Sequence, residues 1–81
     1  MSSYSTIMAK AKRYGDSKRG RMILRFFESA SAIRIEVQDA DLIERREVTK
    51  RELVGLKADE QIARLCDLIH EAINAVRRGE Q

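Results

Sequence analysis

Cys66 and His70 are the side chains whose types and spacing come closest to catalytic chemistry. A thiol and an imidazole one helical turn apart could form a nucleophile and its base, and each is the only residue of its kind in the chain. A reactive thiol also needs an exposed, electropositive environment and a third group that orients the base. Cys66 falls among the apolar residues of its segment, which predicts a buried structural cysteine. An enzyme would need a second subunit to complete a composite site around this pair.

Metal and carboxylate chemistry is equally weakly supported by the sequence. Asp67, His70 and Glu71 share one face of a predicted helix, but a zinc-type site needs further ligands, and the chain has no second His or Cys. Asp39 and Asp41 fit the polar tip of a hairpin, where Asp bonds to its own backbone. We therefore expect no catalytic site, no metal site and no cofactor, and hence a protein that is not an enzyme.

The positive charge of the chain is concentrated at its N-terminus. The formal net charge is +3 at pH 7, yet residues 1–21 hold six Lys and Arg against Asp16 alone, whereas residues 22–81 hold ten against twelve acids. Basic residues at this density can neutralise phosphates, and tyrosines can stack on bases. The alternative is a solvated arm. The nucleic-acid interface that this segment would form comprises Tyr4, Lys10, Lys12, Arg13, Tyr14, Lys18, Arg19 and Arg21.

The basic segment is predicted to contain a short helix. Apolar and aromatic side chains recur at helical spacing over residues 6–14. Ser5 is suited to cap the start of this helix, and Gly15 to follow its end in the left-handed conformation. Residues 15–20 have the Gly, Asp and Ser content of a loop. Residues 1–5 are polar and are expected to fray.

Three strands are predicted in the middle of the chain. Residues 21–27 are apolar with two aromatic rings, and residues 33–38 alternate strictly between apolar and polar side chains. Residues 42–48 form a third, heavily charged strand. In that strand Ile43 and Val48 fall on opposite faces, so either a bulge corrects the alternation or the segment is helical.

The C-terminal third is predicted to be helical. Thr49 and Glu52 have the spacing of a capping box, which would introduce one helical turn over residues 53–56. Residues 58–79 carry the apolar stripe of a long helix that packs one face on a core, and Gly79 is suited to end it. The stripe consists of Ile62, Leu65, Cys66, Ile69, Ala72, Ile73 and Val76.

In the order α-β-β-β-α, these elements predict an α+β fold, a three-stranded antiparallel sheet packed by a long C-terminal helix, with a short N-terminal helix. The first strand places Leu24 and Phe26 on one face. Ile23 and Phe27 lie on the other, where a half-buried strand would carry polar residues. The N-terminal helix, a second copy of the chain or a partner is therefore expected to cover Ile23 and Phe27.

Length and composition favour a single cytoplasmic domain over residues 1–81. One Cys cannot form an internal disulfide, whereas small secreted domains usually carry several. The chain has no apolar run of 18 residues and no apolar block typical of a signal peptide, so no membrane segment is expected. A chain this short buries only about 60% of its unfolded surface. A thin core beside an uncovered sheet face favours a homodimer.

The leading functional hypothesis is a small protein-binding module, an inhibitor or regulator that docks on a larger host complex. In size and layout alone the chain resembles small phage-encoded proteins that inhibit host machinery, anti-CRISPR proteins among them, and no motif carries that resemblance. The alternative is a nucleic-acid-binding protein that uses its basic N-terminal segment. The residues predicted to bind the protein partner are Lys10, Lys12, Arg13, Lys18, Arg19, Arg21, Ile23 and Phe27.

Overall fold

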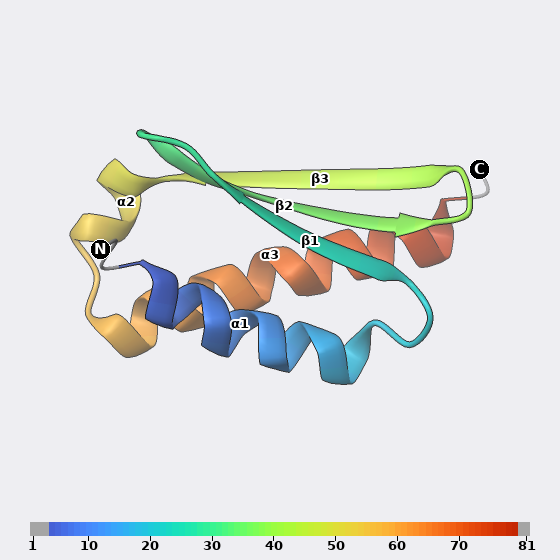
Figure 1. The fold of residues 1–81 in the computed structure, drawn as a ribbon, viewed down its shortest axis with the longest axis horizontal. Coiled ribbons are helices and arrows are strands. Elements are labelled where there is room, and N and C mark those ends of the chain that lie inside the picture. The colour runs from blue at the N-terminus through green and yellow to red at the C-terminus, as the bar shows by residue number, and fades with distance from the viewer. Residues whose placement is uncertain (1–3, 80–81) are drawn as a thin grey trace.

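A computed structural model describes residues 4–79 and confirms the α+β architecture (Figure 1). Three antiparallel strands form one sheet in the order β1-β2-β3, packed against a long C-terminal helix. No helix within residues 4–79 combines the length and the apolar character that a membrane crossing requires. The elements are α1 (Ser5–Lys18), β1 (Ile23–Glu28), β2 (Ala32–Asp39), β3 (Leu42–Thr49), α2 (Lys50–Val54) and α3 (Ala58–Arg78).

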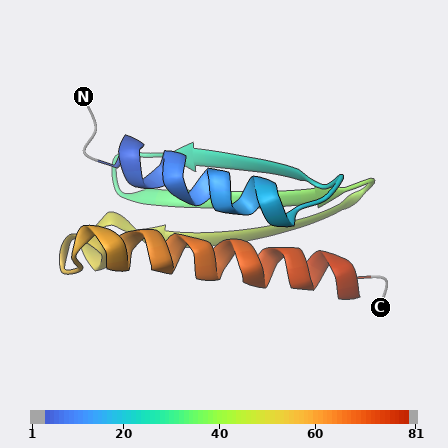
Figure 2. The same ribbon diagram turned by 90° about the horizontal axis from the view of Figure 1, so that it is seen from below.

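Both long helices lie on the same face of the sheet. They run side by side in the same direction, with α1 against β1 and α3 against β2 and β3 (Figure 2). Near their C-terminal ends, Arg77 Nη2 donates to the carbonyl oxygen of Lys18 at 3.2 Å. The core fills the space between the helices and the sheet, and its largest fully buried side chains are Ile33, Ile35, Val37, Leu53, Leu65, Ile69 and Ile73. The opposite face of the sheet carries no helix within the described residues.

The three strands pair in an unbroken register. Each residue from Ala32 to Asp39 has one partner in β3, so the bulge proposed for the third strand is absent, and so is the helical alternative. Ile43 and Val48 do lie on opposite faces. Val48 is buried in the core, whereas Ile43 stays exposed on the open face. The alternation needed no correction because one apolar side chain is simply left in solvent.

The N-terminal helix is longer than predicted. It begins at Ser5, with Tyr4 in the N-cap position, and continues through the expected loop to Lys18. Gly15 is therefore inside the helix and buried, not a left-handed residue at its end. A Cβ at Gly15 would overlap the Leu24 side chain and lie 3.2 Å from Ile69 Cγ2. Gly15 thus permits close packing of α1, β1 and α3.

The left-handed glycine of this region is Gly20, which has a φ of +59° in the turn that leads into β1. The predicted fraying of residues 1–5 can be judged only in part, since residues 1–3 lie outside the described residues. Tyr4 packs against the core, and Ser5 is already helical.

The predicted cap at Thr49 is confirmed. Its Oγ1 accepts a hydrogen bond from the Glu52 backbone N–H at 3.1 Å. The short helix that it caps, α2, spans Lys50–Val54 and so begins earlier than expected. The following helix, α3, covers the predicted range and buries most of the predicted stripe. Leu68 is also buried, whereas Ile62 and Cys66 are only partly buried against the core.

Candidate protein-binding face

The open face of the sheet is built from alternate residues of all three strands. Side chains alternate across a strand, so the residues between the core positions share the face opposite the helices. Cross-strand pairing arranges nine of them in three rows. The rows are Ile23–Gln38–Ile43, Arg25–Glu36–Arg45 and Phe27–Arg34–Glu47.

Three large apolar side chains are exposed on this face. Ile23 is 48% exposed, Phe27 40% and Ile43 38%. The sequence identified Ile23 and Phe27, and neither α1 nor any other described element covers them. It missed Ile43, although the alternation of side chains along the third strand already placed Ile43 and Val48 on opposite faces of the sheet. The three side chains lie near the two ends of the face, Ile23 and Ile43 at one and Phe27 at the other.

The centre of the face is an ion-paired cluster. Glu36 is nearly buried at 8% exposure, and its Oε2 lies 2.8 Å from Arg45 Nε and 3.5 Å from Arg34 Nε. The Arg34 guanidinium also sits 4.9 Å from the centre of the Phe27 ring, within the range of a cation–π contact. Arg25 Nη1 donates to Gln38 Oε1 at 2.9 Å. These contacts connect the long side chains at the centre of the face to one another.

A hollow of about 130 Å³ lies at the Phe27 end of the face. Phe27 and Arg34 form part of its wall, and Glu28 and Glu47 add two carboxylates. The Glu28 carboxylate is also paired with Lys50 at the start of α2. The hollow is large enough for one side chain of a partner and too small for a drug-sized ligand.

Two of the predicted basic contact residues are engaged within the domain. Lys12 Nζ and Arg19 Nε approach the two oxygens of Asp16 at 3.2 and 2.9 Å. The hydrogen bond from Arg19, and then that from Lys12, lowers the pKa of the Asp16 carboxyl below its usual value. Arg19 Nη1 also donates to the Met22 carbonyl oxygen at 2.8 Å. Arg19 therefore joins the end of α1 to the start of the first strand.

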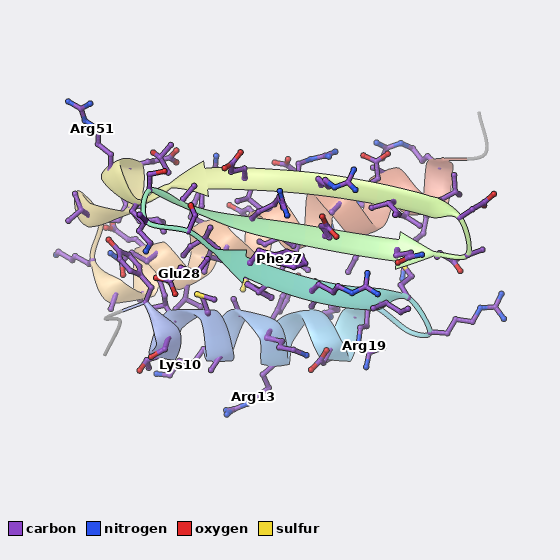
Figure 3. The ribbon with its side chains drawn as sticks, turned by 45° about the horizontal axis from the view of Figure 1, so that its top comes forward. Lys10, Arg13, Arg19, Phe27, Glu28 and Arg51 are labelled. Carbon is purple, nitrogen blue, oxygen red and sulfur yellow. The ribbon has the colours of Figure 1, made fainter. Side chains whose placement is uncertain are left out.

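The other basic residues of the N-terminal segment are exposed. Lys10, Arg13, Lys18 and Arg21 take part in no ion pair within residues 4–79. Lys10 and Arg13 project from α1 on the side away from the sheet (Figure 3). The eight residues predicted to bind a partner therefore divide between two surfaces. Only Ile23 and Phe27 lie on the open face.

The two tyrosines proposed to stack on bases both have cations beside their rings. Lys18 Nζ lies 5.8 Å from the centre of the Tyr14 ring, and Lys50 Nζ lies 5.2 Å from that of Tyr4. Tyr4 is also half-buried against the core. Lys18 therefore occupies one side of the Tyr14 ring, and Tyr4 packs against the core.

Cys66 and His70 of α3 have different surroundings. Cys66 is partly buried against the core, and this burial, with a smaller effect of Asp67, raises the pKa of its thiol. A raised pKa disfavours the thiolate, which is the nucleophilic form. His70 is exposed. Within residues 4–79 no three His, Cys, Asp or Glu side chains come together as a metal site requires.

Comparison with protein-family models, curated proteins and solved structures finds no match for the chain. The candidate site therefore rests on the geometry of the open face alone.

Proposed function

We propose that the protein is a non-catalytic protein-binding module that docks through the open face of its sheet. The observation that carries this proposal is the exposure of Ile23, Phe27 and Ile43 on a sheet face that the helices leave uncovered. Aromatic side chains and arginine are enriched where proteins bind one another, and this face supplies Phe27 beside Arg34. The adjoining hollow would accept a side chain of the partner.

The partner is proposed to be a larger, acidic assembly whose activity the module inhibits or regulates in the cytoplasm. The chain has a formal net charge of +3, and a positive protein meets an acidic surface faster than a neutral one does. The exposed cations that contribute to this charge are Lys10, Arg13, Lys18 and Arg21. Because Lys10 and Arg13 point away from the open face, they act on the rate of association and not as contacts. Lys12 and Arg19 are left out of the binding surface, since Asp16 engages both.

The proposal predicts that Phe27→Ser abolishes partner capture while the fold is kept. Removing an aromatic anchor from an interface costs about 2 kcal/mol or more, a loss of about 30-fold in affinity. Immobilised wild-type protein and variant are compared for the proteins that they retain from a cell lysate, by quantitative mass spectrometry. Val54→Ser is the matched control, because Val54 is 71% exposed and lies on α2, outside the open face. Equal capture by Phe27→Ser and by the wild type would contradict the proposal.

Nucleic-acid binding is the second candidate, and the exposed, unpaired cations of the N-terminal segment favour it. Lys10 and Arg13 lie one helical turn apart on the outer side of α1, where two phosphates of one strand could reach them. The pairing of Lys12 and Arg19 with Asp16 reduces the charge that is available for phosphate. A site of this kind would bind weakly and with little preference for sequence.

This second candidate predicts binding that depends steeply on salt. Fluorescence anisotropy with labelled random single- and double-stranded DNA would show an affinity that falls by more than tenfold between low and near-physiological salt. The double variant Lys10→Glu, Arg13→Glu would remove the binding, whereas Phe27→Ser would leave it unchanged. An absence of binding by the wild type at low salt would exclude the candidate.

A further inference from the structure

The outer edge of β1 is an unpaired strand edge with an apolar sequence. No strand lies beyond β1 within residues 4–79. The Ser29 N–H donates to the Ala32 carbonyl oxygen at 2.9 Å. This bond determines at which residues of β1 the backbone N–H and C=O groups point toward β2. Since bonded and non-bonded pairs alternate along antiparallel strands, the backbone N–H and C=O groups of Leu24 and Phe26 point away from β2. No backbone hydrogen bond within residues 4–79 reaches them from that side.

The two free edges of the sheet differ in their protection. The β3 edge carries four successive charges from Glu44 to Glu47, and charged side chains discourage pairing with another strand. Each edge strand also has a helix beneath it, since α3 contacts β3 and α1 contacts β1 (Figure 2), so it is the charge that distinguishes the two edges. The β1 edge has one charged residue, Arg25, between Ile23 and Phe27, and it contains no Pro and no bulge. An edge of this kind is a template for pairing with a further strand.

We propose that the occupant of this edge is a second copy of the chain, so that two β1 strands pair antiparallel about a two-fold axis at Arg25. In this register Ile23 of one copy lies opposite Phe27 of the other, and Leu24 lies opposite Phe26. Each exposed apolar side chain therefore meets an apolar partner. A register shifted by two residues would instead set Arg25 against Phe27 and Leu24 against Glu28.

The like charges at the centre do not prevent this pairing. The Arg25 guanidinium donates a hydrogen bond to the Gln38 side chain on β2, so it is drawn toward its own sheet and away from the two-fold axis. The result is a continuous six-stranded sheet with all four long helices on one face. Its open face would carry two copies of Ile23 and Phe27 side by side at the centre. The pairing goes beyond the proposed docking function and does not depend on it, because self-association and capture of a foreign protein are separate readouts.

The proposal predicts a disulfide across the two-fold axis in an Arg25→Cys variant. In the proposed dimer Arg25 of one copy lies opposite Arg25 of the other, and the two form a non-hydrogen-bonded pair. Cα atoms in such a pair are about 4.5 Å apart, which is within the range that a disulfide spans. The variant is made in a Cys66→Ala background, so that the new thiol is the only one. Arg45→Cys in the same background is the matched control, because Arg45 flanks Glu36 from the other edge strand. Under mild oxidation we expect Arg25→Cys to form a covalent dimer and Arg45→Cys to remain monomeric.

Two results would overturn the proposal. One is a monomeric mass of 9.3 kDa for the wild type at tens of micromolar in sedimentation. The other is cross-linking of Arg45→Cys as extensive as that of Arg25→Cys, since this would indicate random collision or pairing through β3.

The register is tested separately by exposed substitutions that leave the core intact. The double variant Ile23→Lys, Phe27→Lys and the double variant Ile23→Glu, Phe27→Glu should each be monomeric, because like charges would then face each other. Their mixture should form a heterodimer. A mixture that stays monomeric would contradict the register.

Discussion

Ile69→Ala is expected to lower the free energy of unfolding by about 2–5 kcal/mol. Ile69 is fully buried near the middle of α3, and its side chain packs between that helix, α1 and the sheet. Removing three carbons there loses their transfer free energy and leaves a cavity that three elements would have to close together. A domain of this size has a total stability of only about 4–12 kcal/mol, so the loss is a large share of it.

Urea denaturation followed by circular dichroism measures this loss. Val54→Ala is the matched control, because Val54 is 71% exposed and its truncation should change stability by less than about 0.5 kcal/mol. A change below about 1 kcal/mol for Ile69→Ala would mean that α3 does not pack on the sheet as described.

Gly15→Leu should destabilise the domain by about 1–3 kcal/mol. Even a Cβ at this position overlaps Leu24 and approaches Ile69 Cγ2 to 3.2 Å, so a full side chain must push α1 away from the sheet and from α3. The gain in helix propensity over glycine, up to about 1 kcal/mol, offsets only part of this cost. The urea midpoint of the variant, measured at an unchanged slope, reports the effect.

Gly55→Leu distinguishes this packing effect from a general effect of replacing glycine. Gly55 has a φ of −82°, which any residue adopts, and its nearest neighbour to an added Cβ is 3.9 Å away. That variant should remain within about 0.5 kcal/mol of the wild type. Equal losses at both positions would contradict the role assigned to Gly15.

The second strand and the long helix could be predicted from the sequence because their periodicity is strong. The alternation of residues 33–38 and the stripe of α3 each match one repeat along their whole length. The end of α1 could not be predicted, because a glycine that ends a helix and a glycine that allows close packing inside one look the same in sequence. Burial against Leu24 and Ile69 distinguishes them, and it depends on tertiary contacts.

The candidate site was predicted in part. The alternation of side chains along β1 correctly placed Ile23 and Phe27 on one face of the sheet. The same reasoning misses Ile43, because an apolar residue out of phase indicates a bulge or a helix as readily as it indicates an exposed side chain. The basic residues were grouped by their nearness in sequence. Because α1 continues to Lys18, Asp16 lies within reach of both Lys12 and Arg19. The basic residues therefore divide into two that are paired with Asp16 and others that are in no ion pair among the described residues.

Docking through the open face of the sheet is tested by quantitative capture from lysate with Phe27→Ser and Val54→Ser. If the open face is the functional surface, a defined set of proteins is retained by the wild type and by Val54→Ser and is lost with Phe27→Ser. Retention of the same set by Phe27→Ser, with its fold verified by circular dichroism, would contradict the claim.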